Sequence, residues 1–315
     1  SRISLLALLA VIPFNGFSQE REVPIKYGDM EQWVTRKIHE SSIIGGNTRL
    51  LYEIAPTQEV DGNVAYENMG GSPWGTSNVM AKVMGIVKTN NTVYKEKRYH
   101  GYCARLETHI ERMKVLGMVN ITVLAAGSIF TGSVHEPIKG TKNPQKMLQT
   151  GIPFTKKPVA LQFDYKVKMS DREKRIRATG FSKITDVAGK DYPAAILFLQ
   201  KRWEDANGNV YAKRIGTLVT YYYHSTDWKN NATYEIMYGD ITSRPEYKPH
   251  MMRLQVTENY TVNSKGESVP IHEVAWGDEN DEPTHLYLQF TSSHGGAYVG
   301  SPGNSLWIDN VKLVY

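Results

Sequence analysis

Two kinds of side chain in this sequence could bind a polyhydroxylated ligand such as a sugar. Aromatic rings stack on the apolar C–H face of a pyranose, and planar or charged groups hydrogen-bond neighbouring hydroxyls in pairs. Trp74 stands between a proline and a glycine, which predicts a turn, and the amide of Asn78 follows shortly after it. Trp74 is therefore either a ligand contact or a side chain that closes one end of a hydrophobic core.

A row of polar residues shares one face of a predicted strand. Arg105, Glu107 and His109 alternate with the apolar residues of the stretch 104–110. Such a row is either the solvated face of the strand or, if the strand belongs to a concave sheet, the lining of a groove. We include Arg105 and Glu107 as candidate binding residues.

Aromatic residues also occur near the ends of two later predicted strands. Trp203 ends the first of them and is a further candidate for ligand contact. The stretch 221–223 consists of three tyrosines, and we interpret it as core and cross-strand packing rather than as a binding platform.

Catalytic residues are harder to assign. A glycosidase needs two carboxylates on opposite sides of the scissile bond, and the sequence identifies no partner for Glu107. The chain has no G-x-S-x-G, HExxH or Gly-rich phosphate-loop motif. Cys103 is the single cysteine and is expected to be a small buried residue, and the nine histidines lack metal-ligand spacing. Neither a cysteine nucleophile nor a zinc site is therefore predicted.

Period-2 alternation predicts that strands position these residues. In 161–167, Leu161, Phe163, Tyr165 and Val167 alternate with polar residues, as in a strand with one face on a core. The dipeptide Asn207-Gly208 predicts a tight turn and makes 195–214 a hairpin. Further strands are predicted over 119–125, 215–224, 233–238, 285–291 and 306–315.

Many short strands without a sustained helical period predict an all-β protein, a β-sandwich or jelly roll. The segment 31–39 is either a strand or a short helix. Long connections at 135–158 and 169–193 are expected at the rims of the sandwich, where loops of this length are usually functional or mobile. The absence of a Pro-rich linker or repeat predicts a single domain over 19–315.

The first residues predict export. Arg2 precedes an apolar run over 3–14, and the small residues Gly16 and Ser18 follow it, as in a signal peptide covering 1–18. No segment is long and apolar enough to predict a membrane span. The net charge of +5 is mild for 315 residues, and the basic stretch 172–177 also contains acidic residues. A nucleic-acid partner is therefore not expected.

The chain resembles, from Tyr27 to Tyr315, the Bacteroidetes family known as the "putative carbohydrate metabolism domain". The resemblance is carried by an ordered set of phrases, which includes Met30-Glu31-Gln32-Trp33, Pro73-Trp74-Gly75-Thr76-Ser77-Asn78, Ala104-Arg105-Leu106-Glu107-Thr108, Ala125-Ala126-Gly127-Ser128-Ile129-Phe130, Gly151-Ile152-Pro153-Phe154 and Leu306-Trp307-Ile308-Asp309-Asn310.

This resemblance implies a jelly roll similar to galactose-binding and other carbohydrate-binding modules. It also implies an exported protein in the periplasm, at the cell surface or in the medium, with a glycan and outer-surface glycan-utilisation proteins as partners. The resemblance also implies relatives that carry an N-terminal immunoglobulin-like domain, and this chain is expected to correspond to the jelly roll by itself.

Jelly rolls of this kind often carry a structural calcium ion, held by an acidic residue near the first strand and an aspartate in the last. Glu31 and Asp309 occupy comparable places, with Asp29 close by. Calcium takes six to eight oxygen ligands, which backbone carbonyls could complete. The alternative is that Asp309 sits in a β-bulge and accepts local N–H groups.

Three functions therefore remain open after the sequence. The first is non-catalytic binding of a poly- or oligosaccharide through Trp74, Asn78, Arg105, Glu107 and Trp203. The second is a carbohydrate-active hydrolase or lyase, and the third is a structural or adhesive subunit of the cell surface. Composition favours the first over the third, because no long uncharged apolar stretch follows the predicted signal peptide.

Overall fold

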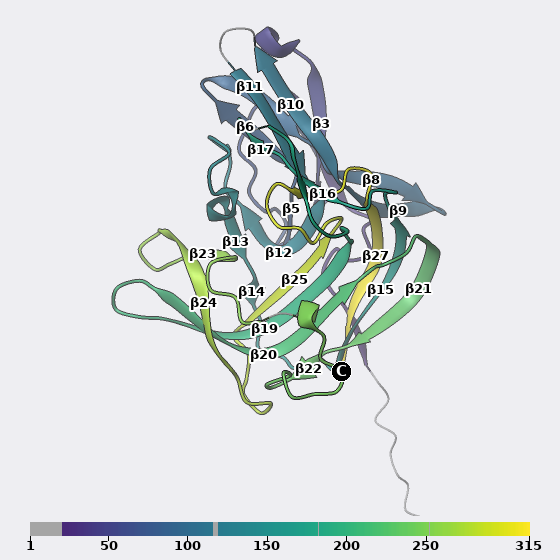
Figure 1. Cartoon of the computed structure of the whole chain (residues 1–315), viewed down its shortest axis with the longest axis vertical. Helices are drawn as coiled ribbons and strands as arrows, with labels where there is room; N and C mark the ends of the chain where they lie inside the picture. The colour runs from purple at the N-terminus through teal and green to yellow at the C-terminus, as the bar shows by residue number, and fades with distance from the viewer. Residues whose placement is uncertain (1–20, 116–118, 182, 252) are drawn as a thin grey trace, which may run out of the picture.

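The computed structural model of the chain describes residues 21–115, 119–181, 183–251 and 253–315. The predicted signal peptide 1–18 lies outside them. Almost all regular structure is β, in two large sheets at one end of the molecule and several small sheets at the other (Figure 1). Within the described ranges, no helix is long and apolar enough to cross a membrane.

The first large sheet is antiparallel and six-stranded. Its order is β21-β15-β27-β9-β8, with β1 also paired to β27. The long alternating segment predicted over 161–167 is its strand β15. The strand bounds are β1 Glu22–Pro24, β8 Val93–Arg98, β9 Gly101–Glu107, β15 Ala160–Lys168, β21 Thr226–Glu235 and β27 Ser305–Val314.

The second large sheet has ten strands in the order β13-β12-β25-β19-β20-β24-β23, with β5, β14 and β22 attached to its sides. Its longest pair, β19 and β20, is the predicted hairpin, closed at Asp205–Asn209 with Gly208 at φ 90°. The bounds are β5 Trp74–Thr76, β12 Ser128–Val134, β13 Leu148–Thr150, β14 Ile152–Pro153, β19 Ala194–Glu204, β20 Val210–Tyr221, β22 Met237–Tyr238, β23 Tyr260–Val262, β24 Ser268–Trp276 and β25 His285–Thr291.

The main hydrophobic core lies between these two sheets. Leu161 and Phe163 of β15 meet Leu288 and Phe290 of β25 in one buried cluster, and the rings of Phe163 and Phe290 are 4.8 Å apart, edge to face. Burial of this apolar surface is the dominant favourable term in folding, and it holds the sheets face to face. The predicted all-β sandwich is confirmed.

Four small sheets lie beyond one end of the sandwich (Figure 1). The segment 31–39, which the sequence left open between strand and helix, contains strand β2. The small-sheet strands are β2 Trp33–His39, β3 Thr48–Ile54, β4 Gln58–Asp61, β6 Val79–Val83, β7 Ile86–Asn90, β10 His109–Val115, β11 Val119–Ala125, β16 Arg175–Arg177, β17 Thr179–Gly180, β18 Thr185–Val187 and β26 Val299–Gly300. The short 3-10 helices are η1 Ser42–Ile44, η2 Pro144–Met147 and η3 Pro249–Met251.

The outer face of the ten-stranded sheet, which points away from the main core, is also apolar. Side chains alternate along β19, so that Ala195 and Leu197 face the main core while Ile196 and Phe198 face outward. Phe198 belongs to a second buried cluster together with Val219 of β20. This outer face needs a cover, and the small sheets and the connection after β12 provide part of it.

Candidate ligand-binding cleft

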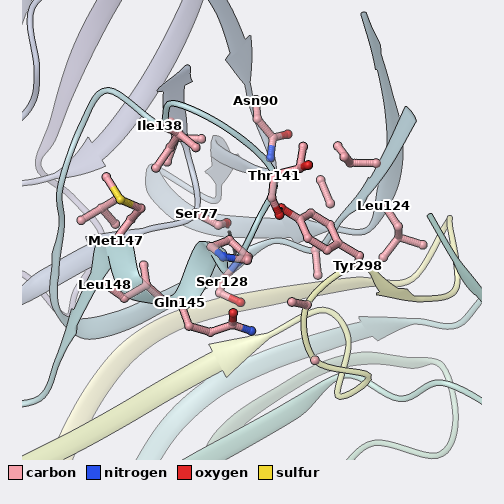
Figure 2. A pocket seen from close by; sticks show the side chains of 18 of the residues that line it. Ser77, Asn90, Leu124, Ser128, Ile138, Thr141, Gln145, Met147, Leu148 and Tyr298 are labelled. Atoms are coloured by element: carbon pink, nitrogen blue, oxygen red, sulfur yellow. Dashed lines mark hydrogen bonds between the residues drawn. The ribbon is translucent and has the colours of Figure 1, made fainter. Parts of the chain in front are cut away.

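A cleft of about 560 Å³ opens on the outer face of the ten-stranded sheet. Its floor is formed by side chains of β19 and β25, and its walls by strands β6, β7, β10 and β11 together with the segment 134–148. This volume falls in the range usual for small-molecule sites. Figure 2 shows some of the side chains that line it: Ile138, Met147 and Leu148 on the left, Asn90 at the top, Thr141, Ser77, Ser128 and Gln145 near the centre, and Leu124 and Tyr298 on the right.

The floor of the cleft is apolar, and amide groups lie among the apolar side chains. Ile196, Phe198 and Tyr287 form the floor. Gln289 lies beside them, and its Oε1 accepts a hydrogen bond of 2.8 Å from the Tyr287 hydroxyl. Asn90 contributes a buried Oδ1 that has no hydrogen-bond partner within the described part of the chain. The cleft therefore combines an apolar floor with the polar groups of amide side chains.

The segment 134–148 is anchored on both sides of the cleft. On one side the backbone of Ile138 pairs with β6. The Ile138 N–H donates to Met80 O at 3.0 Å, and the Ile138 carbonyl accepts the Lys82 N–H at 2.8 Å. On the other side the Tyr298 hydroxyl donates to Thr141 O at 2.7 Å. The wall is therefore fixed by backbone pairing and a long-range tyrosine contact.

A buried ion network fixes the start of this segment. Arg36 of β2 pairs with Glu53 at 2.9 Å and with Glu136 at 2.5 Å, and all three side chains are at most 4% exposed. The Glu136 carboxylate also accepts the backbone N–H groups of Tyr66 and Met80. Burial raises the pKa of Glu53 to about 7, although Arg36 opposes the shift. The network is structural, because the polar atoms of its carboxylates are already used.

Two carboxylates line the cleft, and both are held ionised. Burial alone would raise the pKa of Glu111, but the hydrogen bond from His109 and the charge of Lys88 bring it below its ordinary value. The pKa of Glu258 is also lowered despite its burial, because two backbone N–H groups and Arg253 stabilise its charge. Neither group is suited to hold a proton at neutral pH.

The structure places Trp74 and Asn78 in the interior. Trp74 is fully buried in strand β5 rather than on a turn, and its Nε1 donates to Lys26 O at 2.9 Å. The Asn78 side chain is 1% exposed and makes four hydrogen bonds, all to the backbone of Tyr52, Thr92 and Val93. A buried ring offers no face to a surface ligand. Trp74 is therefore a side chain of the hydrophobic core, the second of the two roles considered from the sequence. Asn78 is a structural residue whose hydrogen bonds connect separate segments of the chain.

Arg105 and Glu107 lie on the outer face of the six-stranded sheet, outside the cleft. Arg105 pairs with Glu107 and, at 2.6 Å, with Glu96, and its guanidinium lies 4.1 Å from the centre of the Tyr94 ring. The predicted polar row is shorter than expected, because β9 ends at Glu107 and His109 begins the separate strand β10. Arg105 and Glu107 therefore bind each other, and Arg105 covers the Tyr94 ring on which a sugar would have to stack.

Trp203 lies on a third surface. It is 43% exposed and stacks on Tyr211, its cross-strand partner in the β19–β20 hairpin, with ring centres 5.9 Å apart. The structure therefore does not bring Trp203 together with Arg105 or with the cleft.

The proposed calcium ligands Glu31 and Asp309 have other partners. Glu31 Oε1 accepts the Tyr102 N–H at 3.1 Å. Asp309 and Asp164 both pair with Arg98 Nη1, at 2.6 and 2.8 Å. Because the guanidinium already supplies the positive charge between these carboxylates, the residues do not fit a calcium ion there. No group of three or more potential metal-ligating side chains occurs in the part of the chain that the structure describes.

The observed surroundings of Asp309 match the alternative weighed from the sequence. The register between β15 and β27 shifts next to Asp309, and its Oδ1 accepts the Asn310 N–H at 2.8 Å. Asn310 itself has a positive φ of 53°. Burial raises the pKa of Asp309 to about 6, against the opposing effect of Arg98.

Sequence reasoning missed the cleft floor. Residues 194–199 form a continuous apolar run, which is typical of a strand buried on both faces. That pattern could have indicated that the outer face of β19 is covered. It could not indicate that the cover is incomplete and leaves a cleft.

The fold and the cleft define an all-β sandwich protein with a cleft of the size usual for small-molecule sites. The chain belongs to the family described as "Putative carbohydrate metabolism domain", which matches residues 52–314. This membership relates the protein to carbohydrates. A solved structure described as a "putative glycoside hydrolase" from Bacteroides thetaiotaomicron is similar, with 16% identity, a TM-score of 0.43, and coverage of 86% of this chain and 81% of that chain. No curated protein matches the sequence.

Proposed function

We propose that this chain is an exported protein that binds a poly- or oligosaccharide in the cleft without cleaving it. The observation that carries the proposal is the cleft itself, an opening of about 560 Å³ in which an apolar floor and amide side chains lie together in a protein of a carbohydrate family. Export is supported by the sequence pattern of residues 1–18. Other exported glycan-utilisation proteins would then be its functional partners.

The side chains of the cleft suit the two surfaces of a sugar. Ile138, Leu148 and Tyr298 are partly exposed in the cleft and can take the C–H faces of a pyranose, which water solvates poorly. The amides of Asn90, Gln145 and Gln289 can donate to and accept from neighbouring hydroxyls. Sites of this kind remain partly wet, so we expect a Kd between micromolar and millimolar, about −8 to −4 kcal/mol.

Binding is favoured over hydrolysis by the state of the carboxylates. A glycosidase needs one carboxyl group that keeps a proton near neutral pH, and such a group has a raised pKa. The pKa values of the two cleft carboxylates, Glu111 and Glu258, are lowered. The raised ones, Glu53 and Asp309, lie outside the cleft lining and are held by Arg36 and Arg98.

The proposal is tested first on a glycan array and then by calorimetry with the polysaccharide that binds best. Asn90→Ala and Gln145→Ala remove cleft amides and should each weaken binding about twofold to tenfold, the equivalent of one hydrogen bond. Arg105→Ala and Trp203→Ala change the surfaces outside the cleft and should leave the affinity unchanged.

The opposite pattern would move the site to one of those surfaces and refute the cleft. Reducing-end release is followed in the same samples. Release that is lost in Glu111→Gln would instead favour a hydrolase.

A further inference from the structure

Five aromatic rings gather at one end of the cleft. They belong to Tyr192, Tyr221, Tyr223, His250 and His294, and we call them the aromatic platform. Tyr192 lies against three of them, with ring centres 6.3 Å from Tyr221, 4.7 Å from Tyr223 and 5.5 Å from His294. Tyr221 in turn lies 4.6 Å from both histidine rings. The sequence does not predict such a platform, because three consecutive tyrosines at 221–223 favour core and cross-strand packing.

The platform is continuous with the cleft. Tyr221 packs against the same outer cluster of the ten-stranded sheet as Phe198, which is part of the cleft floor. His294 lines the cleft and also belongs to the platform. One surface therefore runs from the floor of the cleft to the end of β20.

The rings of the platform are available to a ligand. Tyr223 is 47% exposed, and Tyr192 and His294 are partly exposed. Two other rings at the surface lie beside a cation: the Arg98 guanidinium lies 3.8 Å from the centre of the Trp228 ring and 5.2 Å from the centre of the Tyr99 ring. The described cation–ring contacts all fall on rings other than those of the platform.

The platform is also held in place by buried groups. His294 Nδ1 lies 3.2 Å from Asp191 Oδ1, and the Tyr192 backbone N–H donates to the same imidazole nitrogen at 3.0 Å. Asp191 is 1% exposed and is fixed by Ser293 and by the backbone N–H of Ser301. A ring held this way loses little conformational freedom when a ligand stacks on it.

We propose that the aromatic platform is a stacking subsite for one further pyranose unit, so that the cleft and the platform together take a chain of sugar units. This inference rests on the proposed function. Rigid rings with an open face suit the C–H surface of a pyranose, and their position beside the cleft suits the next unit of the same chain.

The test compares oligosaccharides of increasing length with variants of the exposed ring. The ligands are the disaccharide to the hexasaccharide prepared from the polysaccharide that binds best on the array, and the measurement is calorimetry. In the wild type, affinity should rise once the chain is long enough to reach the platform. Tyr223→Ala should weaken the longer ligands about threefold to tenfold and leave the disaccharide unchanged.

Two control variants separate stacking from other effects. Tyr223→Phe keeps the ring and should retain the affinity for long ligands. Trp203→Ala removes a ring of similar exposure outside the cleft and should change nothing.

Each contrary result has a definite meaning. If Tyr223→Ala binds every length as the wild type does, the subsite is refuted while glycan binding in the cleft stands. An equal loss of affinity for oligosaccharides of every length also refutes the additional subsite, because the platform would then be the primary binding site. If the wild type binds no glycan, the proposed function fails and this inference fails with it.

Discussion

Replacing Arg36 with methionine should destabilise the protein strongly, because it leaves two buried carboxylates without their cation. Arg36 is 2% exposed in its side chain, and its partners Glu53 and Glu136 are 4% and 2% exposed. Breaking a buried pair by removing one partner typically costs about 3 to 5 kcal/mol. Because methionine roughly fills the volume of the arginine side chain, the loss of stability would come from the missing charge and not from a cavity.

Arg105 provides a matched control within the same chain. It also lies between two carboxylates, Glu96 and Glu107, but its side chain is 24% exposed and theirs are 42% and 32% exposed. Ion pairs that water reaches contribute about 0 to 1 kcal/mol. Arg105→Met should therefore cost several-fold less than Arg36→Met.

The penalty in Arg36→Met should depend on pH. Burial already places the folded-state pKa of Glu53 at about 7, above its ordinary value of 4.5, and loss of Arg36 raises it further. A carboxyl whose pKa is higher in the folded state stabilises the fold when protonated, and this stabilisation is lost as pH rises through that range. Arg36→Met should thus lose more stability at about pH 8 than at about pH 5.

Urea unfolding of wild type, Arg36→Met and Arg105→Met at both pH values measures these differences. Because Glu136 begins the cleft wall, glycan affinity should also fall in Arg36→Met and not in Arg105→Met. Equal losses of stability in the two variants, or a penalty in Arg36→Met that does not grow with pH, would refute the reasoning.

Three further outcomes follow from the structure. Trp74→Ala should lower the free energy of unfolding by about 3 to 5 kcal/mol, because the whole ring is buried; a loss of glycan affinity at full stability would instead restore Trp74 as a ligand contact. Calcium and chelator should give the same Tm, because Arg98 already compensates Asp309; a calcium-dependent rise that Asp309→Ala abolishes would confirm the calcium site. Mass spectrometry of the protein from its native envelope should find a chain beginning near Gln19, and an intact N-terminus in the cytoplasm would contradict export.

The sequence by itself determined the features that local geometry encodes. The alternation from Leu161 to Val167 predicted strand β15, because side chains in a strand point to opposite faces with a period of two. The dipeptide Asn207-Gly208 predicted the β19–β20 turn, because both residues tolerate positive φ. Enough such strands without helical periods made the all-β class predictable.

Only the tertiary structure decided which polar and aromatic residues are available. Trp74 has the flanking residues of a turn, yet it is buried because β12 pairs with its strand and the Lys26 carbonyl accepts its indole N–H. Tyr223 belongs to a stretch that reads as packing, yet its ring is exposed beside the cleft. Exposure depends on what distant segments cover, and a residue's neighbours in sequence do not encode this.

The cleft is the clearest case. Its lining residues come from positions between Thr76 and Tyr298, on the ten-stranded sheet, the small sheets and the connections between strands. No regular spacing in the sequence therefore identifies them as neighbours. Alternation could place Ile196 and Phe198 on one face of β19. Whether that face was filled by side chains or left open depended on how the segment 134–148 closes over it, and long-range contacts such as those of Glu136 and Tyr298 decide that.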